Sequence, residues 1–346
     1  MIELNAGAIT GITMAATLGV YLGVVASLRY RRRNIIAALP PPTGDDLEII
    51  HQITTATLTD FPFLYRTSLE FGFFKTYGIP TIAKLLVATG ETVGSCTRRL
   101  IDTDLIIREF NEHPLTSERS HLAIRRLNHL HGKYPISNAD FLYVLCVFIV
   151  EPVRWINRFG FRKLHTNEML AHYLHWRQVG IYMGITQIPA SIEAAAIHLE
   201  AYEAEKLIYT DASNKIAKAT VEGFLKPFPS FLHGGGRQAV YALTPPNLRV
   251  AMGFPEAPHA LTSVLLGTLS AMGCFVRYLM LPRSKLSART GKVPNKDGSY
   301  CPAFAIYDKT TYKDGYFIHK LGPAKFAEDG LLGTLHQSQP DSIKTD

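Results

Sequence analysis

Two arginines and two histidines stand close together near the middle of the chain, and an apolar run that follows them ends on a glutamate. The basic group comprises Arg125, Arg126, His129 and His131, and the glutamate is Glu151. Titratable side chains beside a core helix cost stability unless they are hydrogen-bonded or paired. These five residues are therefore the first candidates for chemistry.

His131 is placed by the pattern of its own helix, for which Thr116 and Ser117 are both candidate N-caps. Ile124, Leu127 and His131 fall at i, i+3 and i+7, so they share the apolar face. A histidine on such a face is either a core residue bonded to a backbone carbonyl or an axial ligand of a metal or haem held between helices. The pattern leaves both interpretations open.

Glu151 follows the most apolar helix of the body, which we expect from Asn138 to about Trp155. The apolar run from Phe141 to Val150 is too short to span a bilayer and therefore predicts a core helix. Glu151 is either half of a buried ion pair with Arg154, three residues on, or a general acid or base near a reaction centre.

The N-terminus carries a charge-free run from Leu4 to Leu28, and arginines follow it at positions 29, 31, 32 and 33. A run of this length rises about 37 Å as a helix, enough to cross a bilayer. The arginines predict that the rest of the chain faces the cytosol, behind a single-pass anchor. We therefore expect residues 1–33 to be a membrane anchor with a basic flank.

The remaining chain divides by composition into three parts. Residues 34–60 form a linker and a first helix, residues 61–327 a single large helical domain, and residues 328–346 a polar tail expected to be disordered. The uncharged run from Leu261 to Met280, interrupted only by Arg277, is either a core helix or a second membrane span. Its glycines and its internal position favour the core helix.

The overall composition excludes several classes of protein. The formal net charge is +7, but the arginines cluster at one place and no basic–aromatic alternation indicates nucleic acid. The four cysteines have neither zinc-ligand nor disulfide-framework spacing, and neither a P-loop nor a dinucleotide-binding glycine motif is present. A di-iron site is disfavoured because the spacing from Glu168 to His172 is one residue too long and has no second copy.

A resemblance to a known family is carried by RRLNHLHGKYPISNADFLYVLCVFIVEPVRWI, then FRKL and HWRQVGIYMGI, with EFGFFKTYGIPTIAKLL upstream and LMLPR downstream. These segments, spread over roughly residues 60–320, resemble the fungal MpaB-type membrane-bound oxygenases. That family shares a catalytic domain with the bacterial latex-clearing rubber oxygenases.

The resemblance implies an all-α, haem-b-binding fold and an iron-dependent oxidoreductase. The implied reaction uses dioxygen to cleave a carbon–carbon double bond of a prenylated or other lipophilic substrate. It also implies a role in secondary metabolite biosynthesis at the endoplasmic reticulum membrane. The oligomeric state is left undetermined.

By the same resemblance, Arg126 and Glu151 are catalytic candidates and His131 is the candidate iron ligand, with Arg125 and His129 beside the cofactor. In the bacterial relatives the haem-ligating histidine aligns with a position that here is Phe148, so this chain departs from the pattern. The alternative ligands, besides His131, are His129, His172 and His175.

Aromatic residues are dense from Phe61 to Leu86, either as packing or as the wall of a cavity for an apolar ligand. Phe71, Phe74 and Phe148 are the pocket residues we expect. Two other functions remain open: an isomerase, cyclase or dehydratase on the same fold, and a non-enzymatic membrane-anchored protein that binds lipid or haem.

Overall fold

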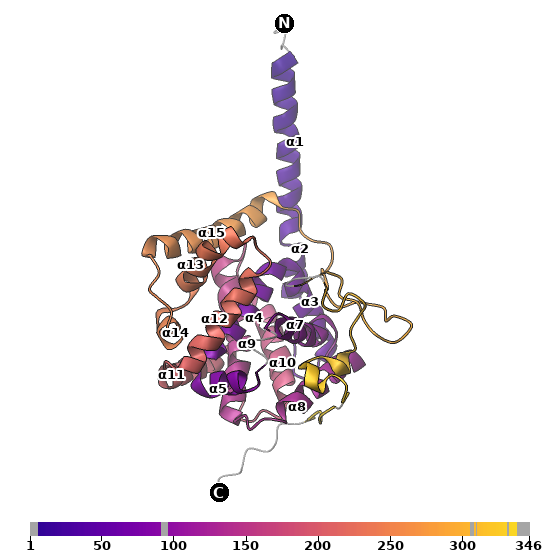
Figure 1. Cartoon of the computed structure of the whole chain (residues 1–346). Coiled ribbons are helices and arrows are strands. Elements are labelled where there is room, and N and C mark those ends of the chain that lie inside the picture. The colour runs from indigo at the N-terminus through magenta and orange to yellow at the C-terminus, as the bar shows by residue number, and fades with distance from the viewer. Residues whose placement is uncertain (1–5, 91–95, 305–307, 309, 331, 338–346) are drawn as a thin grey trace.

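The fold is all-α, as the sequence predicts. The computed structural model describes residues 6–90, 96–304, 308, 310–330 and 332–337, and within these ranges one isolated bridge between Tyr300 and Tyr316 is the only β-structure. A globular helical body carries one long helix, α1, that projects away from it (Figure 1).

The helices of the N-terminal part are α1 (Ala6–Arg29), α2 (Arg31–Ala37), α3 (Leu47–Asp60), α4 (Pro62–Lys75), η1 (Thr76–Gly78), α5 (Pro80–Ala88), α7 (Cys96–Glu112) and α8 (Glu118–His131). Those that follow are α9 (Asn138–Phe159), α10 (Thr166–Tyr182), α11 (Ile192–Lys206), α12 (Asp211–Leu225), η2 (Ser230–Leu232), α13 (His233–Leu243), α14 (Pro246–Ala251), α15 (His259–Leu279), η3 (Ile318–Lys320) and η4 (Ala324–Phe326).

Helix α9 is the centre of the body. Its residues from Leu145 to Val153 are all buried, and α4, α10, α11 and α15 pack around it. A helix that is apolar on every side needs such a complete coat of neighbours. Ser137 caps its start by accepting a hydrogen bond from the Asp140 amide at 3.1 Å. The sequence-based prediction of a core helix is therefore confirmed.

Helix α4 approaches α9 closely because Gly72 has no side chain. A Cβ at Gly72 would lie 2.8 Å from Cγ1 of Val147 on α9. The close approach fixes which face of α4 points inward and which points toward α7. The candidate site depends on this division.

The chain after α15 wraps back over α7 and α8, and its helices within the described ranges are the short 3-10 helices η3 and η4. Tyr316, Ile318 and Leu321 of this segment are buried in the main core. Residues 328–330 and 332–337 belong to the tail that we expected to be disordered, but the described part contacts α8 and α10: Gly333 donates to Arg125 O at 2.8 Å and His336 to Tyr182 O at 3.2 Å. Residues 338–346 lie outside the described ranges.

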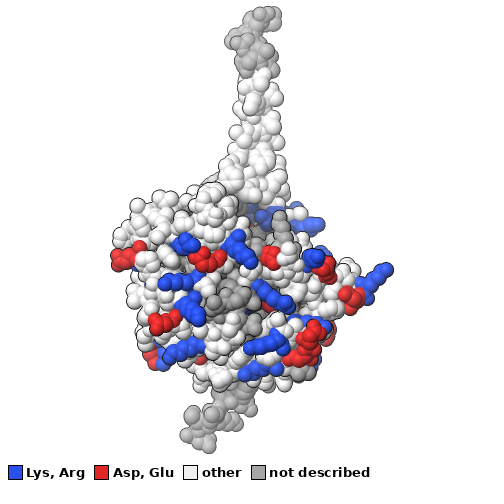
Figure 2. Space-filling view, viewed as in Figure 1, with Lys and Arg blue, Asp and Glu red and all other residues white. Residues whose placement is uncertain are grey.

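Among the described residues, two helices are long and apolar enough to cross a membrane. One is a segment from Thr10 to Ala37, which comprises most of α1 together with α2, and the other is α15. The visible face of α1 carries no lysine, arginine or acidic side chain along the described part of its length, whereas charges surround the body below it (Figure 2).

Our expectation that the run from Leu261 to Met280 is a buried core helix is wrong. Only one face of α15 packs inward, through residues such as Leu266, Leu269 and Met272. The opposite face is exposed, with Val264 and Phe275 more than half accessible. Composition alone misled the prediction, because a run can be apolar on every side while the fold covers only one of them.

Candidate active site

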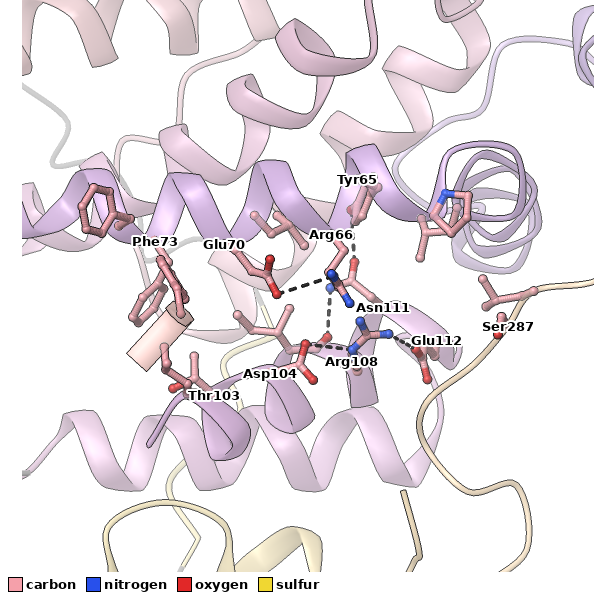
Figure 3. Close-up of a pocket in the computed structure, with 18 of the residues that line it drawn as sticks. Tyr65, Arg66, Glu70, Phe73, Thr103, Asp104, Arg108, Asn111, Glu112 and Ser287 are labelled. Atoms are coloured by element: carbon pink, nitrogen blue, oxygen red, sulfur yellow. Dashed lines mark hydrogen bonds and ion pairs between the residues drawn. The ribbon is translucent and has the colours of Figure 1, made fainter. Parts of the chain in front are cut away.

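A cleft lies between α4 and α7 (Figure 3). The cleft is partly open to solvent, and its internal volume is ≈ 100 Å³. Its apolar walls are formed by Leu58, Leu69, Phe73, Phe74, Tyr77, Leu100, Ile107 and Phe224. The α4 residues recur at intervals of three and four, so the cleft takes one face of α4, beside the face that packs on α9 at Gly72.

The other half of the cleft is charged. On α7, Arg108 donates to Asp104 at 2.8 Å and to Glu112 at 2.7 Å, and on α4 the Arg66 guanidinium lies 3.5 Å from Glu70 (Figure 3). Burial lowers the pKa of Arg108, but the two carboxylates raise it by a larger amount, so its pKa lies above the ordinary value. Arg108 is thus a permanent cation on an otherwise acidic helix face.

The segment after α15 closes one end of the cleft. Leu286 and Ser287 line it, and Arg289 pairs with Asp104. Glu112 accepts the backbone amides of Arg289 at 3.0 Å and Thr290 at 2.9 Å. The acidic groups of α7 therefore hold the wall in place.

The floor of the cleft is a hydrogen-bonded cluster around Tyr65. Its hydroxyl lies 3.2 Å from Asn111 Oδ1, accepts from Trp176 Nε1 at 3.3 Å and lies 3.5 Å from His172 Nδ1. Nε2 of His172 lies 3.1 Å from the carbonyl oxygen of Ile149, so Nε2 carries the proton and donates it. Both ring nitrogens of His172 are engaged, and burial lowers its pKa to about 4.

His175 lies one turn further along α10 and differs from His172 in one respect. Its Nε2 is buried and has no hydrogen-bond partner among the described residues. Burial, with smaller contributions from His172 and His51, lowers the pKa of His175 to about 3. The ring is therefore neutral at physiological pH and keeps a lone pair available.

His131 ends α8 and has similar properties. Burial, followed by the charge of Arg99, lowers its pKa to about 4, and its Nδ1 is buried without a partner in the described part of the chain. Its ring packs on Phe141, with 5.3 Å between the centroids. Arg99 in turn lies over the rings of Phe73 and Tyr77, which line the cleft.

Glu151 belongs to a buried cluster on the other side of α4. Lys75 Nζ lies 2.8 Å from Glu151 Oε1 and 2.8 Å from Glu203 Oε1, and Tyr143 donates to Glu203 at 3.2 Å. Burial lowers the pKa of Lys75, but the two carboxylates outweigh it, so its pKa is raised. Lys75 is therefore charged and holds two carboxylates together.

The ion-pair partner we expected for Glu151 is not the principal one. Arg154 reaches Glu151 only at 4.0 Å and pairs instead with Glu200 on α11. Lys75 makes the short contact, because α4 approaches α9 closely at Gly72 and Lys75 follows three residues later on the same side of α4. Sequence spacing shows partners on one helix and misses those on another.

The structure does not bring His131 and Glu151 together. His131 contacts Phe141 near the start of α9, and Glu151 lies ten residues further along that helix, a rise of about 15 Å. His172 is closer, since it donates to the carbonyl of Ile149.

Arg126 is fully buried and binds the C-terminal segment. It donates to Leu321 O at 2.9 Å, to Phe326 O at 2.6 Å and to Asp329 Oδ1 at 2.7 Å. These contacts give Arg126 a structural function, and its expected catalytic function stays a prediction.

His129 and Arg125 contact the same segment. His129 Nε2 lies 3.2 Å from Asp329 Oδ2, and Arg125 donates to Gly333 O at 3.1 Å. Their expected place beside a cofactor stays a prediction as well.

The three phenylalanines expected in a substrate pocket have different positions. Phe74 lines the cleft. Phe148 lies directly behind it, stacked between Phe73 and Trp176 with centroid distances of 6.3 and 4.9 Å. Phe71 points elsewhere and packs on Trp155 at 5.3 Å.

Sequence reasoning did not single out the polar residues of the cleft. The signal was present, because Asp104, Arg108 and Glu112 follow one another at i, i+4 on α7. Such spacing is usual on helix faces that meet solvent. Only the packing of α4 over α7 shows that this charged face lines a cleft.

Whether these residues fit a haem depends on the nitrogen donors. Among the described residues, no three histidine, cysteine or acidic side chains gather as a metal-binding group. A haem iron needs only one axial imidazole. His131 Nδ1 and His175 Nε2 are neutral and without a hydrogen-bond partner, and both fit that requirement.

The fold and the site define a class of all-α protein with a partly apolar cleft in its helical body and an apolar helix near its N-terminus. Residues 116–277 match the family model "ER-bound oxygenase mpaB/B'/Rubber oxygenase, catalytic domain". The chain is 33% identical to ER-bound oxygenase mpaB' of Penicillium brevicompactum over 323 residues, covering 78% of this chain and 76% of the relative.

Two further relatives carry the same description. ER-bound oxygenase mpaB of Penicillium roqueforti (strain FM164) is 30% identical over 258 residues, covering 67% of this chain and 87% of the relative. ER-bound oxygenase mpaB of Penicillium brevicompactum is 40% identical over 133 residues, 37% of this chain and 34% of the relative. The chain therefore belongs to the ER-bound oxygenase family, and its resemblance to MpaB-type oxygenases is confirmed.

Proposed function

We propose that this oxygenase uses haem b and dioxygen to cleave a carbon–carbon double bond of a prenylated or other lipophilic substrate, in secondary metabolite biosynthesis. We place it at the endoplasmic reticulum membrane, anchored by residues 4–28 with its body in the cytosol. The observation that carries the proposal is the cleft between α4 and α7, which combines an extended apolar wall with polar groups at one end.

The substrate chain would lie along the apolar wall. Phe73, Phe74 and Tyr77 offer flat surfaces for an isoprenoid chain, and Phe148 supports Phe73 from behind. Burying an apolar chain against such a wall removes it from water and favours binding in proportion to the area covered. Arg66 and Arg108 would orient a polar head group of the substrate at the charged end.

When bound, haem b would supply iron for the activation of dioxygen. His131 is the ligand we propose, because its ring is neutral and its buried Nδ1 has no hydrogen-bond partner among the described residues. His175 meets the same criteria and lies nearer to Glu151 along the bundle. The two histidines are therefore tested as a pair.

Glu151 is the residue we propose for proton transfer. It lies in the cluster with Lys75 and does not line the cleft, so it would act on a reacting atom of the substrate that reaches past α4 to the side of α9. Its Oε1 accepts a hydrogen bond from Lys75 Nζ at 2.8 Å, which orients the carboxylate. A carboxylate oriented in this way can accept a proton at its other oxygen and later return it.

The test is the visible spectrum of the purified full-length protein after reconstitution with haem b, with bound haem and iron quantified and dioxygen uptake measured. We expect a Soret band and substrate-dependent uptake in the natural protein. His131→Ala is expected to abolish haem retention, whereas His175→Ala keeps it, because only the axial bond fixes the iron.

Each other result points to a specific alternative. Full haem loading in His131→Ala together with loss in His175→Ala would move the ligand to α10. A colourless protein that still turns over a lipophilic substrate would favour an isomerase, cyclase or dehydratase. A coloured protein without dioxygen uptake would favour a non-enzymatic binding protein.

A further inference from the structure

Helix α15 presents an uncharged surface beside the base of α1. Its outward residues include Val264, Phe275 and Tyr278, whose side chains are 63%, 53% and 57% exposed. No aspartate, glutamate, lysine or arginine occurs between Glu256 and Arg277. Figure 1 shows α15 lying across the end of the body from which α1 projects, and in Figure 2 the shoulder at this end lacks the charges found below it.

The packing of α15 is incompatible with crossing a membrane. A Cβ at Gly273 would lie 2.4 Å from the carbonyl oxygen of Phe159, so the helix rests directly on the end of α9. Leu269 and Val276 pack on the same cluster of buried residues. A helix bound to the body along one face, from Leu266 to Val276, is not surrounded by lipid as an isolated span would be.

Contacts with α1 fix the level of α15. Tyr21 donates its hydroxyl to Leu279 O at 2.7 Å, while Arg29 donates to Arg277 O at 3.3 Å and also to Met280 O. Tyr21 precedes Arg29 by eight residues, a rise of about 12 Å along α1. The C-terminal end of α15 therefore lies beside the last two turns of α1. If α1 crosses a bilayer, these turns lie in the zone where the span meets the head groups.

The polar groups of α15 suit that zone. Thr268 and Ser270 donate their hydroxyls to carbonyls of their own helix, Val264 O at 2.8 Å and Leu266 O at 3.1 Å. In a medium that offers few hydrogen bonds, such internal pairing avoids the cost of unsatisfied donors.

Aromatic and basic residues border the surface. Arg277 lies over the rings of Tyr30 and Tyr278. Two exposed arginines lie close to this border. Arg31 follows Tyr30 in the sequence, and Arg283 accepts a hydrogen bond from Arg32 at its backbone carbonyl. Tyrosine with arginine is typical of the interface between a bilayer and water.

We propose that α15 lies in the plane of the bilayer that α1 crosses, with its outward face immersed at the boundary of head groups and acyl chains. The partner is a lipid surface carrying anionic head groups, which the bordering arginines attract. The protein would thus hold the membrane with one helix across it and another along it. The inference rests on the proposed membrane anchor.

The test measures the depth of spin labels in the full-length chain. Single cysteines replace Val264 and Phe275 in a protein in which Cys96, Cys274 and Cys301 are serine and the buried Cys146 is kept. Leu18→Cys on α1 reports on the anchor, and Ile197→Cys on α11, where Ile197 is 70% exposed, reports on the aqueous surface. The chain is reconstituted in phosphatidylcholine vesicles containing phosphatidylserine, and the labels are relaxed by dioxygen and by a water-soluble nickel complex.

We expect the labels at 264 and 275 to favour dioxygen over nickel and to lie at equal, shallow depth, whereas the label at 197 favours nickel. The two positions are separated by about 16 Å along the helix. A difference in depth close to that distance would mean that α15 spans the bilayer and would overturn the inference. Labels at 264 and 275 that behave like the label at 197, while position 18 lies in lipid, would also overturn it and leave the anchor intact.

A second copy of the chain and a failed anchor each give a different result. Exclusion of both dioxygen and nickel, with dipolar broadening between labels, would show that a second copy covers the face of α15, and the inference would be wrong. A label at position 18 that is exposed to water would remove the anchor itself, and the inference would fail with it.

Discussion

At the scale of single residues, one lysine determines how Glu151 can act. Lys75 pairs with both Glu151 and Glu203, each at 2.8 Å, so one cation faces two buried carboxylates. Removing either carboxylate leaves Lys75 with one partner, which avoids the large penalty of an unpaired buried charge. The cluster therefore permits a direct test in which the two glutamates are matched.

We predict that Glu151→Gln keeps the fold and the cofactor but slows turnover at least about a hundredfold, because general acid–base groups contribute about 10²–10⁴-fold. Glu203→Gln is the control, since it also takes one carboxylate from Lys75. Both variants should lose a similar, small amount of thermal stability. Rates are compared with Tm and haem content for the two proteins.

Equal loss of activity in both variants would show that the pairing of Lys75 matters and not proton transfer at Glu151. Near-normal turnover in a folded, cofactor-loaded Glu151→Gln protein would remove Glu151 from the chemistry. The two results are distinct because the variants change the same ion cluster by one charge each.

The residue scale also shows where prediction from sequence ends. The inward face of His131 followed from spacing along one helix, and in the structure the residue is partly buried, with its ring on Phe141. The prediction that Arg154 is the principal partner of Glu151 was wrong, because the actual partner, Lys75, lies 76 positions earlier in the chain. The contacts of Arg126 with Leu321 and Asp329 were missed for the same reason.

At the scale of elements, the contact between α4 and α9 separates two chemical environments. The cleft takes one face of α4, and the cluster of Lys75, Glu151 and Glu203 takes the other. Gly72 sets the distance between the helices. The identity of α9 as the core helix could be predicted from composition, but the neighbour that packs on it could not.

We predict that Gly72→Ala destabilises the protein by about 1–3 kcal/mol, because overpacking a helix contact typically costs that much and exceeds the gain in helix propensity. The matched control is Gly235→Ala on α13, where a Cβ meets nothing within 4 Å. This change should be neutral or stabilise by up to about 1 kcal/mol. Chemical denaturation of the three proteins measures the difference.

A Gly72→Ala protein as stable as the natural one would mean that Val147 shifts freely and that α4 is not fixed at this point. Destabilisation by both substitutions would show that neither helix tolerates a methyl group and would remove the argument from close approach.

Two elements show the limits of pattern. Helix α7 carries Asp104, Arg108 and Glu112 at i, i+4 spacing, a pattern whose charged face would ordinarily meet water; here that face forms one side of the cleft. Helix α15 has the composition of a core helix or a span, yet the structure covers one face and exposes the other. Both outcomes depend on which other helices pack against these two, and the periodicity of a single helix carries no information about its neighbours.

At the scale of the whole molecule, both α1 and α15 would contribute to membrane binding. A transmembrane helix inserts almost irreversibly, whereas a helix lying in the interface binds reversibly and responds to the charge of the lipid. A chain that loses the span but keeps α15 should therefore still bind membranes, in a different manner.

Deleting residues 2–20 tests this division and keeps the contacts that Tyr21 and Arg29 make with α15. The remaining nine residues of α1 rise only about 13 Å, too little to span a bilayer. We predict that the truncated chain floats with anionic vesicles at low salt and is released by high salt or carbonate, whereas the full chain resists both. Adding Val264→Glu with Phe275→Glu should leave it in the soluble fraction, while Ile197→Glu should not. A truncated chain that ignores vesicles would assign all binding to α1, and one that resists carbonate would require α15 to insert more deeply than its packing on α9 allows.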